Sequence, residues 1–304
     1  MDIKELFKSK NLSEASIKIY SDKLKILNDG KNIRSLNFLN KTNDIMNKLK
    51  KYKPNSQRTF IIAITSALKC QLDINPNNKK IKKRYEDYSK ILKNYNNDLR
   101  DQTIITENEN NNWISMDDIR EIYKELTLKK NKSLDDNRNH LILSLYHLIP
   151  PRRNKDYQFM RIAKKGIKGL PNEFNYFDMK ERKFIFNNYK TARTYQQQIE
   201  DIPDDLFDVM INYIKKHKLK NNDFLINNLM KKDEPLRDVN SITRILNNIF
   251  NKKIGVSMLR KIYLTDKYKE QRDEMMNDVR MMGTSINTIN NNYIKDRQPA
   301  SIYI

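Results

Sequence analysis

Ser257-Met258-Leu259-Arg260 lies in an apolar run in the last third of the chain, and Gly283-Thr284-Ser285 and Tyr293 follow it. The glycine comes 23 residues after Arg260, and the tyrosine comes ten residues after the glycine. The apolar residues on both sides of Arg260 predict a helix that buries one face and carries the arginine beside it. Arg260 and Tyr293 are therefore candidate functional residues at a defined spacing.

Two further groups of candidates lie upstream. Residues 150–156 are Pro-Pro-Arg-Arg-Asn-Lys-Asp, a basic segment that follows a predicted helix. Lys190 lies in a charged turn between two predicted strands, and Lys183 at the preceding turn is an alternative. Guanidinium groups suit the charge that develops on a phosphate, a lysine can protonate a leaving oxygen, and a tyrosine can act as the nucleophile. These residue types together indicate cleavage of a phosphodiester.

This set of residues resembles the tyrosine recombinase (phage-type integrase) family. The stretch from Met282 to Lys295 is similar to the family's box around its catalytic tyrosine, in which a glycine precedes the tyrosine by ten residues. The resemblance implies that Tyr293 is the nucleophile and that Arg260 is the second of two catalytic arginines. It implies no metal, ATP or other cofactor, because a 3′-phosphotyrosine link stores the energy of the broken bond.

The resemblance also assigns roles to the upstream residues. Arg153-Asn154-Lys155-Asp156 is similar to the family's Arg-x-x-Glu segment, which makes Arg153 the first arginine and Asp156 its supporting acid. Arg152 has the same local setting and is the alternative for the first arginine. Lys190 takes the place of the lysine that the family carries on a hairpin, where it acts as general acid.

Two positions depart from the family pattern. Ser257 stands where His-x-x-Arg has its histidine, and Thr284 stands where the family has a later His or Trp. Neither residue titrates near neutral pH, so neither can act as an ordinary general base. Both can donate a hydrogen bond to a phosphate oxygen, and we expect that supporting role for them.

The charge of the chain points to a polyanionic partner. Its net charge is +21, with 59 Lys and Arg against 38 Asp and Glu. Residues 1–100 hold 23 basic and 10 acidic residues, a net of +13, whereas the remaining 204 hold 36 and 28, a net of +8. We therefore expect the N-terminal third to bind duplex DNA. Its most basic run is Lys79, Lys80, Lys82, Lys83 and Arg84, predicted to contact phosphates.

The hydropathy pattern predicts a mainly α-helical chain with one small antiparallel β-sheet. Residues 1–100 predict four helices and no strand, with Ser13 as the cap of the first helix and Asp29-Gly30 as its end. Residues 101–112 are polar and non-periodic, which predicts a linker. Residues 113–304 predict a second domain, whose first helix begins with a capping box from Ser115 to Asp118.

The second domain contains the predicted sheet. Residues 175–179, 183–187 and 195–202 show short alternating patterns, which predict a three-stranded meander. Helical periodicity resumes near Pro203 and continues almost to the end, with brief breaks at 221–222, Gly255 and Gly283. By the resemblance, residues 1–100 are a helical core-binding domain and residues 113–304 a catalytic domain.

The remaining composition limits the alternatives. A single cysteine, Cys70, excludes an intramolecular disulfide and a multi-cysteine zinc site. No apolar stretch approaches the roughly 18 residues of a membrane span, and no signal peptide is visible at the N-terminus. We expect an intracellular protein that is not secreted, with no membrane partner, in the host cytoplasm or nucleus if its source is a virus.

The resemblance implies a site-specific recombinase or integrase of a mobile element or virus. It would be a monomer when free and a homo-tetramer on specific duplex sites, with the tail at 298–304 docked on a neighbouring copy. A type IB topoisomerase is one alternative, because it uses the same arginine, lysine and tyrosine chemistry. A non-catalytic DNA-binding protein with a degenerate recombinase fold is the other, favoured by Ser257 and Thr284.

Overall fold

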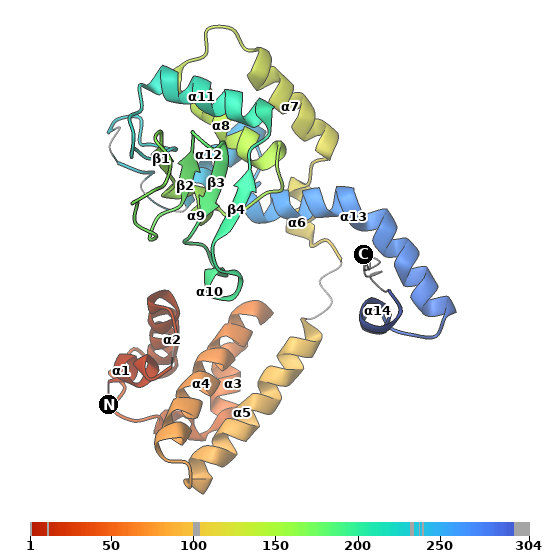
Figure 1. Cartoon of the computed structure of the whole chain (residues 1–304). Helices are drawn as coiled ribbons and strands as arrows, with labels where there is room; N and C mark the ends of the chain where they lie inside the picture. The colour runs from red at the N-terminus through yellow and green to blue at the C-terminus, as the bar shows by residue number, and fades with distance from the viewer. Residues whose placement is uncertain are drawn as a thin grey trace, which may run out of the picture. The chain divides into compact units, whose positions relative to one another are not determined.

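The computed structural model describes residues 2–10, 12–99, 104–231, 234–236, 238 and 240–294. The chain divides into two compact units, Met1–Ile105 and Thr106–Ile304. Helices dominate both units, and a small sheet lies in the second (Figure 1). The predicted fold class, mainly α with a small sheet, is confirmed.

The first unit consists of helices joined by turns, with no strand among its described residues. Its elements are α1 (Ile3–Lys8), α2 (Glu14–Leu27), the 3₁₀ turn η1 (Asn37–Asn40), α3 (Thr42–Leu49), α4 (Pro54–Ile74) and α5 (Lys79–Asp98). The most apolar helix, α4, packs against α1, α2 and α5 and buries Phe60, Ile61 and Ile64 completely. Burial of this stripe is the main stabilising term of the unit.

The prediction of four helices in this unit was one helix short. The six residues of α1 are too few to show a helical period, although Leu6 and Phe7 are buried. The predicted cap is confirmed, because the Ser13 hydroxyl accepts a hydrogen bond from the Ser16 amide at 3.2 Å. Asp29 and Gly30 end α2 with positive φ angles of 54° and 76°.

The second unit contains helices along its described length in addition to the sheet. Its helices are α6 (Glu107–Asn112), α7 (Met116–Leu128), α8 (Leu134–His147), α9 (Asn154–Gln158), α10 (Ala192–Tyr195), α11 (Asp204–His217), α12 (Asn240–Phe250), α13 (Val256–Met281) and α14 (Ile286–Thr288), the last followed by a π-helical stretch, η2 (Ile289–Tyr293). The capping box of Ser115 and Asp118 is confirmed. The predicted linker contains α6, which sequence periodicity missed because all six of its residues are Glu or Asn.

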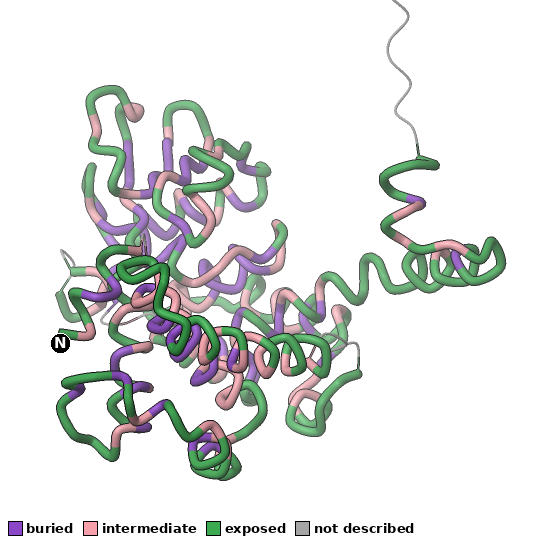
Figure 2. Tube along the Cα trace, turned by 90° about the horizontal axis from the view of Figure 1, so that it is seen from below, coloured by how far each residue is buried: buried purple, intermediate pink, exposed green. Residues whose placement is uncertain are grey.

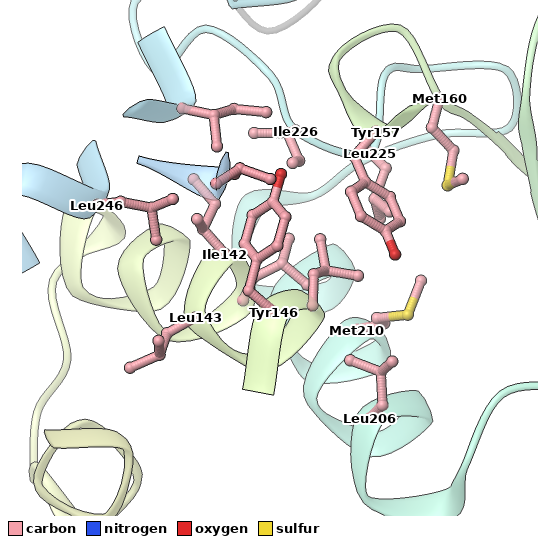
Figure 3. Close-up of a cluster of buried hydrophobic side chains, with 14 of the residues drawn as sticks. Ile142, Leu143, Tyr146, Tyr157, Met160, Leu206, Met210, Leu225, Ile226 and Leu246 are labelled. Atoms are coloured by element: carbon pink, nitrogen blue, oxygen red, sulfur yellow. The ribbon is translucent and has the colours of Figure 1, made fainter. Parts of the chain in front are cut away.

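The core of the second unit surrounds α8. Residues 140–146 are all buried, and α8 packs against α7, α11 and α12. Figure 3 shows Ile142 and Tyr146 of α8 among apolar side chains of other elements, including Met210 of α11 and Leu246 of α12. This core is the base on which the sheet and α9 are held.

The sheet has four strands in the order β1-β2-β3-β4. They are β1 (Arg161–Ala163), β2 (Tyr176–Asp178), β3 (Lys183–Phe186) and β4 (Gln198–Asp201). The predicted meander is confirmed for β2, β3 and β4, which pair antiparallel. The sheet is nevertheless mixed, because β1 pairs parallel with β2. The Arg-Ile-Ala sequence of β1 shows no alternating pattern, and this strand was not predicted. The third predicted strand also begins late, since Tyr195 belongs to α10.

The helical pattern predicted after Pro203 is interrupted for longer than expected. No helix occurs between α11 and α12 among the described residues of that interval. Leu219, Leu225 and Ile226 are buried there without a helix, and Phe224 forms an isolated β-bridge with Arg161. Their spacing imitated a helical period, and burial against the sheet and α11 decided the conformation instead.

The long helix α13 has two halves of different character. Its first turns bury Val256, Leu259 and Ile262, whereas the residues from Leu264 onward are mostly exposed (Figure 2). Over the residues that the structure describes, no helix combines the length and apolar character needed to cross a bilayer.

Candidate functional site

A hollow of about 360 Å³ lies beside β3 and β4 in the second unit. Its walls come from the segment after α8, from α9, from β3 and β4 with their connection, and from the first turns of α13. The side chains that line it are those of Ile149, Pro150, Pro151, Arg152, Arg153, Asp156, Phe184, Phe186, Tyr189, Thr191, Tyr195, Gln198, Glu200, Asp201 and Arg260. It therefore brings together three arginines from segments more than 100 residues apart.

Arg152 is the most firmly held of the three arginines. Its Nε donates to Asp156 Oδ2 at 3.1 Å, and its Nη2 donates to Gln198 Oε1 at 2.8 Å. Its guanidinium carbon lies 3.7 Å from the centre of the Phe186 ring. The side chain is only 20% exposed. Contacts at the edge and on the face of the guanidinium fix its plane, as a preorganised anion site requires.

Asp156 supports Arg152 rather than Arg153, the arginine that the sequence pattern assigned to it. The cause is local: Arg153 is the N-cap of α9, and its backbone oxygen accepts the Asp156 N–H at 2.9 Å. Burial raises the pKa of Asp156 above its ordinary value, and the nearby Arg152 and Arg153 charges oppose that rise. Its Oδ1 is buried and forms no hydrogen bond with the described residues.

Arg153 and Arg260 complete the basic lining. Both side chains are half-buried, and neither forms an ion pair with a residue in the described parts of the chain. Arg260 lies in the second turn of α13, next to Leu259, which is buried in the core. Half-buried guanidinium groups without a carboxylate partner favour an anionic ligand that has still to bind.

The start of α13 is fixed close to the Arg152–Arg153 segment. Gly255 precedes α13, and a Cβ at this position would lie 3.2 Å from Cγ2 of Thr243 on α12. The Thr243 hydroxyl oxygen in turn accepts a hydrogen bond from Asn154 Nδ2 at 3.0 Å. The glycine therefore allows α13 to begin against α12, which is tied to the residue that follows Arg153.

Two carboxylates at the edge of the hollow reduce its positive charge. Glu200 and Asp201 of β4 both line it, and both are exposed. Asp201 lies 3.6 Å from Lys183 Nζ, which gives the alternative lysine an acidic partner. The buried part of the hollow keeps three arginines and one carboxylate, so its inner surface remains basic.

Lys190 lies on the connection between β3 and β4 but does not line the hollow itself. Its neighbours Tyr189 and Thr191 both do. Tyr189 is buried and donates its hydroxyl proton to the Gln196 oxygen at 2.7 Å, whereas Lys190 is exposed. Lys190 therefore lies at the rim of the hollow, between two chain neighbours that both line it.

Tyr293 lies outside the arginine hollow. It is 60% exposed, at the end of η2, and lines a different hollow with Gln271, Glu274, Met275, Asp278, Met282, Ile289 and Ile294. Gln271 is eleven residues beyond Arg260 on α13, which corresponds to about 16 Å along a helix axis. The structure thus does not bring Tyr293 to the arginines of its own chain.

Ser257 and Thr284 are also separated. Ser257 is exposed in the first turn of α13, three residues before Arg260 and on the same helical face. Thr284 follows Gly283, which has a φ of +63°, at the far end of the helix, and its amide donates to the Val279 oxygen at 3.1 Å. Ser257 can therefore act with Arg260, whereas Thr284 belongs to the Tyr293 segment. The predicted tail at 298–304 lies outside the described residues.

The basic run of the first unit forms the start of α5. Lys79, Lys80, Lys82 and Lys83 are exposed, whereas Arg84 is half-buried and donates to the Leu36 oxygen at 3.4 Å. Cations in the first turn of a helix oppose its dipole, so these lysines do not stabilise α5. Their exposure fits a surface that binds an anion, and Arg84 instead connects α5 to the segment before η1.

Gln198, Phe186 and Asn175 were not predicted as site residues. Gln198 and Phe186 hold Arg152, and Asn175 is buried beside Asp156. An amide or an aromatic ring in a short strand gives no sequence signal of its own. No group of three or more His, Cys, Asp or Glu that could hold a metal occurs in the described ranges.

The sequence matches no model of a known protein family, and no curated protein matches it. Among solved structures, the crystal structure of XerA recombinase is similar to this chain, with a TM-score of 0.37 and 13% sequence identity. The similarity covers 88% of this chain and 82% of that chain. A TM-score this low supports no assignment of activity or of site residues, which depend on the geometry described above.

Proposed function

We propose that this protein binds duplex DNA and cuts and rejoins one strand through a 3′-phosphotyrosine link, as a site-specific recombinase or integrase. The observation that carries the proposal is the convergence of Arg152, Arg153 and Arg260 on one hollow. One guanidinium is fixed by Asp156 and Gln198, and the others have no described carboxylate partner. This arrangement suits a phosphate whose non-bridging oxygens gain charge in a transition state.

The reaction uses groups that this chain carries. The Tyr293 hydroxyl gives up its proton to solvent, its oxygen attacks the phosphorus, and the bond from phosphorus to the 5′ oxygen breaks. Lys190 protonates the departing 5′ oxygen as general acid, while the arginines hold the non-bridging oxygens. Rejoining is the reverse reaction, in which a 5′ hydroxyl attacks the phosphotyrosine. The protein–DNA bond retains the energy of the phosphodiester, so the chemistry consumes no ATP.

We further propose that Tyr293 enters the arginine hollow of a second copy on DNA. Within one chain the two sites are separated by about 16 Å along α13. Met282 and Ile294, which line the same hollow as Tyr293, are exposed. Apolar side chains grouped in this way suit a surface that another protein covers. This proposal agrees with the predicted assembly of several copies on two DNA sites.

Covalent trapping tests the proposal. Nicked duplexes built from the ends of the genetic element that encodes the protein release a short strand on cleavage, so the adduct persists on a denaturing gel. The wild type should give a 3′-linked adduct that Tyr293→Phe does not form. Tyr195→Phe is the matched control, because Tyr195 is 63% exposed and lines the arginine hollow itself. Loss of the adduct in Tyr195→Phe alone would assign the nucleophile to that residue.

The position of Tyr293 also favours the second candidate, a DNA-binding protein without cleavage activity. Tight, salt-sensitive binding with no adduct from any nicked duplex would support it. Relaxation of supercoiled plasmid by a monomer would instead support a type IB topoisomerase.

A further inference from the structure

Asn175 is a buried side chain that joins two separate parts of the proposed site. It directly precedes β2 and is only 3% exposed. Its Nδ2 donates to the backbone oxygen of Asp156 at 2.8 Å and to that of Asn188 at 3.0 Å. Its Oδ1 accepts the backbone N–H groups of Asn187 at 2.8 Å and of Asn188 at 2.7 Å. One amide thus connects α9 to the β3–β4 connection.

These four hydrogen bonds use the full capacity of an asparagine side chain, two donated and two accepted. All of its partners are backbone groups, so Asn175 fixes the course of the chain at both ends of the contact. No other residue type of this size supplies two donors and two acceptors. Burial makes each bond costly to lose, because a partner left unpaired has no water to replace it.

The contact sets the position from which Lys190 extends. Asn175 holds both backbone groups of Asn188, two residues before the lysine. Tyr189 is then fixed by its hydroxyl bond to the Gln196 oxygen, and its ring centre lies 5.4 Å from the guanidinium carbon of Arg152. The chain is therefore held up to Tyr189, the residue directly before the exposed Lys190.

The other end of the contact is the helix that holds Arg152. The Asp156 backbone accepts from Asn175, while the Asp156 side chain accepts from Arg152. A single residue therefore relates the arginine that binds the phosphate to the hairpin that carries the general acid. Displacement of a catalytic group by about 1 Å can cost on the order of 10²-fold in rate.

We infer that Asn175 is a positioning residue that holds Lys190 in register with Arg152, an inference that rests on the proposed function. In the cleavage step the Tyr293 hydroxyl proton passes to solvent as the bond from its oxygen to phosphorus forms. The bond from phosphorus to the 5′ oxygen breaks, and the Lys190 proton passes to that oxygen. If Asn175 acts through Lys190, its loss slows the step in which the 5′ oxygen leaves.

A substrate with sulfur in place of the bridging 5′ oxygen isolates that step. A thiolate is a far more stable anion than an alkoxide, since a thiol has a pKa of about 8.5, and it leaves without a general acid. Adduct formation would be timed for the wild type, Lys190→Ala and Asn175→Asp on the oxygen and sulfur substrates. Asn175→Asp keeps the size and the acceptors of the side chain but loses both donors.

Asn175→Asp should cut the oxygen substrate about 100-fold more slowly than the wild type. It should cut the sulfur substrate at a rate within a few-fold of wild type. Lys190→Ala should show the same pattern on both substrates. The ratio of the two rates within one preparation does not depend on the fraction of folded protein. Asn175→Ser is the second variant if Asn175→Asp folds poorly. The double variant Lys190→Ala/Asn175→Asp should be no slower than Lys190→Ala.

Asn188→Ala is the matched control. The Asn188 side chain is exposed and donates to the Glu173 oxygen at 3.1 Å, so both rates should stay at wild-type values. Equal slowing of both substrates by the Asn175 variants would overturn the inference and leave the residue a structural role. Absence of an adduct from the wild type on either substrate would overturn the proposed function instead, and the inference with it.

Discussion

Arg152→Ala removes the one cation that, among the described residues, is bonded to the buried carboxylate of Asp156. In the native structure the Arg152 Nε lies 3.1 Å from Asp156 Oδ2, and the Asp156 side chain is 3% exposed. Without the arginine, Asp156 keeps a buried charge without its bonded cation, or takes up a proton. The size of the effect on stability therefore depends on pH.

Breaking a buried ion pair by removing one partner costs about 3–5 kcal/mol. We expect about 3 kcal/mol at pH 7, since burial already raises the pKa of Asp156 and eases its protonation. A group whose folded pKa is raised above its unfolded value stabilises the fold below that unfolded value and loses the contribution as pH rises. The cost of Arg152→Ala should therefore be smaller near pH 4 than at pH 7.

The double variant Arg152→Ala/Asp156→Asn separates charge from packing. It has no buried carboxylate, so the losses are the contacts of Arg152 with the Phe186 and Tyr189 rings and its hydrogen bond to Gln198, about 1–2 kcal/mol. Chemical unfolding followed by tryptophan fluorescence measures the second unit selectively, because Trp113 is the only tryptophan and packs against that unit's core. Asp156→Asn alone is the matched single variant that completes the cycle.

Two results would contradict this expectation: an Arg152→Ala variant as stable as the wild type at pH 7, or no recovery of stability when Asp156→Asn is added to it. Either result would mean that Asp156 is not charged against Arg152 in the folded protein.

Burial and the Lys132 charge lower the pKa of His140 from 6.5 to about 4. The unfolded chain therefore takes up a proton first, and His140 should lower stability by up to about 3 kcal/mol between pH 6.5 and 4. The fall in stability over that range should be smaller by this amount in His140→Gln, while His147, whose pKa burial also lowers, still contributes. Replacing Lys79, Lys80, Lys82 and Lys83 with Gln should lower the steepness with which the logarithm of the DNA-binding constant falls with log salt by up to about 3.6. Arg84→Gln is the control and should leave this slope nearly unchanged, because the Arg84 side chain bonds to backbone oxygens. Equal slopes for the wild type and the lysine variant in gel-shift titrations would exclude α5 from the DNA interface. Mixing Tyr293→Phe with Arg260→Ala should restore adduct formation that neither variant shows alone, and an inactive mixture would mean that Tyr293 reaches the arginines of its own chain.

The parts of the fold that the sequence predicted are those with a long, regular signal. The buried stripe of α4, the cap at Ser13 and the three antiparallel strands all follow from local periodicity and capping chemistry. Elements without such a signal were missed: α1 has only six residues, α6 consists of Glu and Asn alone, and β1 shows no alternating pattern. The spacing of Leu219, Leu225 and Ile226 suggested a helix, but these residues are buried in a segment without one. Tertiary packing rather than helical periodicity accounts for their position.

The candidate site was predictable by residue type but not by contact. The sequence pointed to Arg152, Arg153 and Arg260, and the structure places all three on one hollow. The sequence did not show which arginine the Asp156 side chain contacts, because this depends on the position of Arg153 as the N-cap of α9. It also could not separate Tyr293 from the arginines, since spacing along the chain does not state where α13 ends and turns.

The most direct test of the proposed mechanism replaces one non-bridging oxygen of the scissile phosphate with a methyl group. A methylphosphonate carries no charge there, so an enzyme that uses Arg260 to hold that charge no longer needs it. Adduct formation by Arg260→Ala should be lost on the phosphate duplex and recovered on the methylphosphonate duplex, while Tyr293→Phe should form no adduct on either. Failure of the methylphosphonate to rescue Arg260→Ala would contradict the assignment of the arginine hollow as the phosphate site.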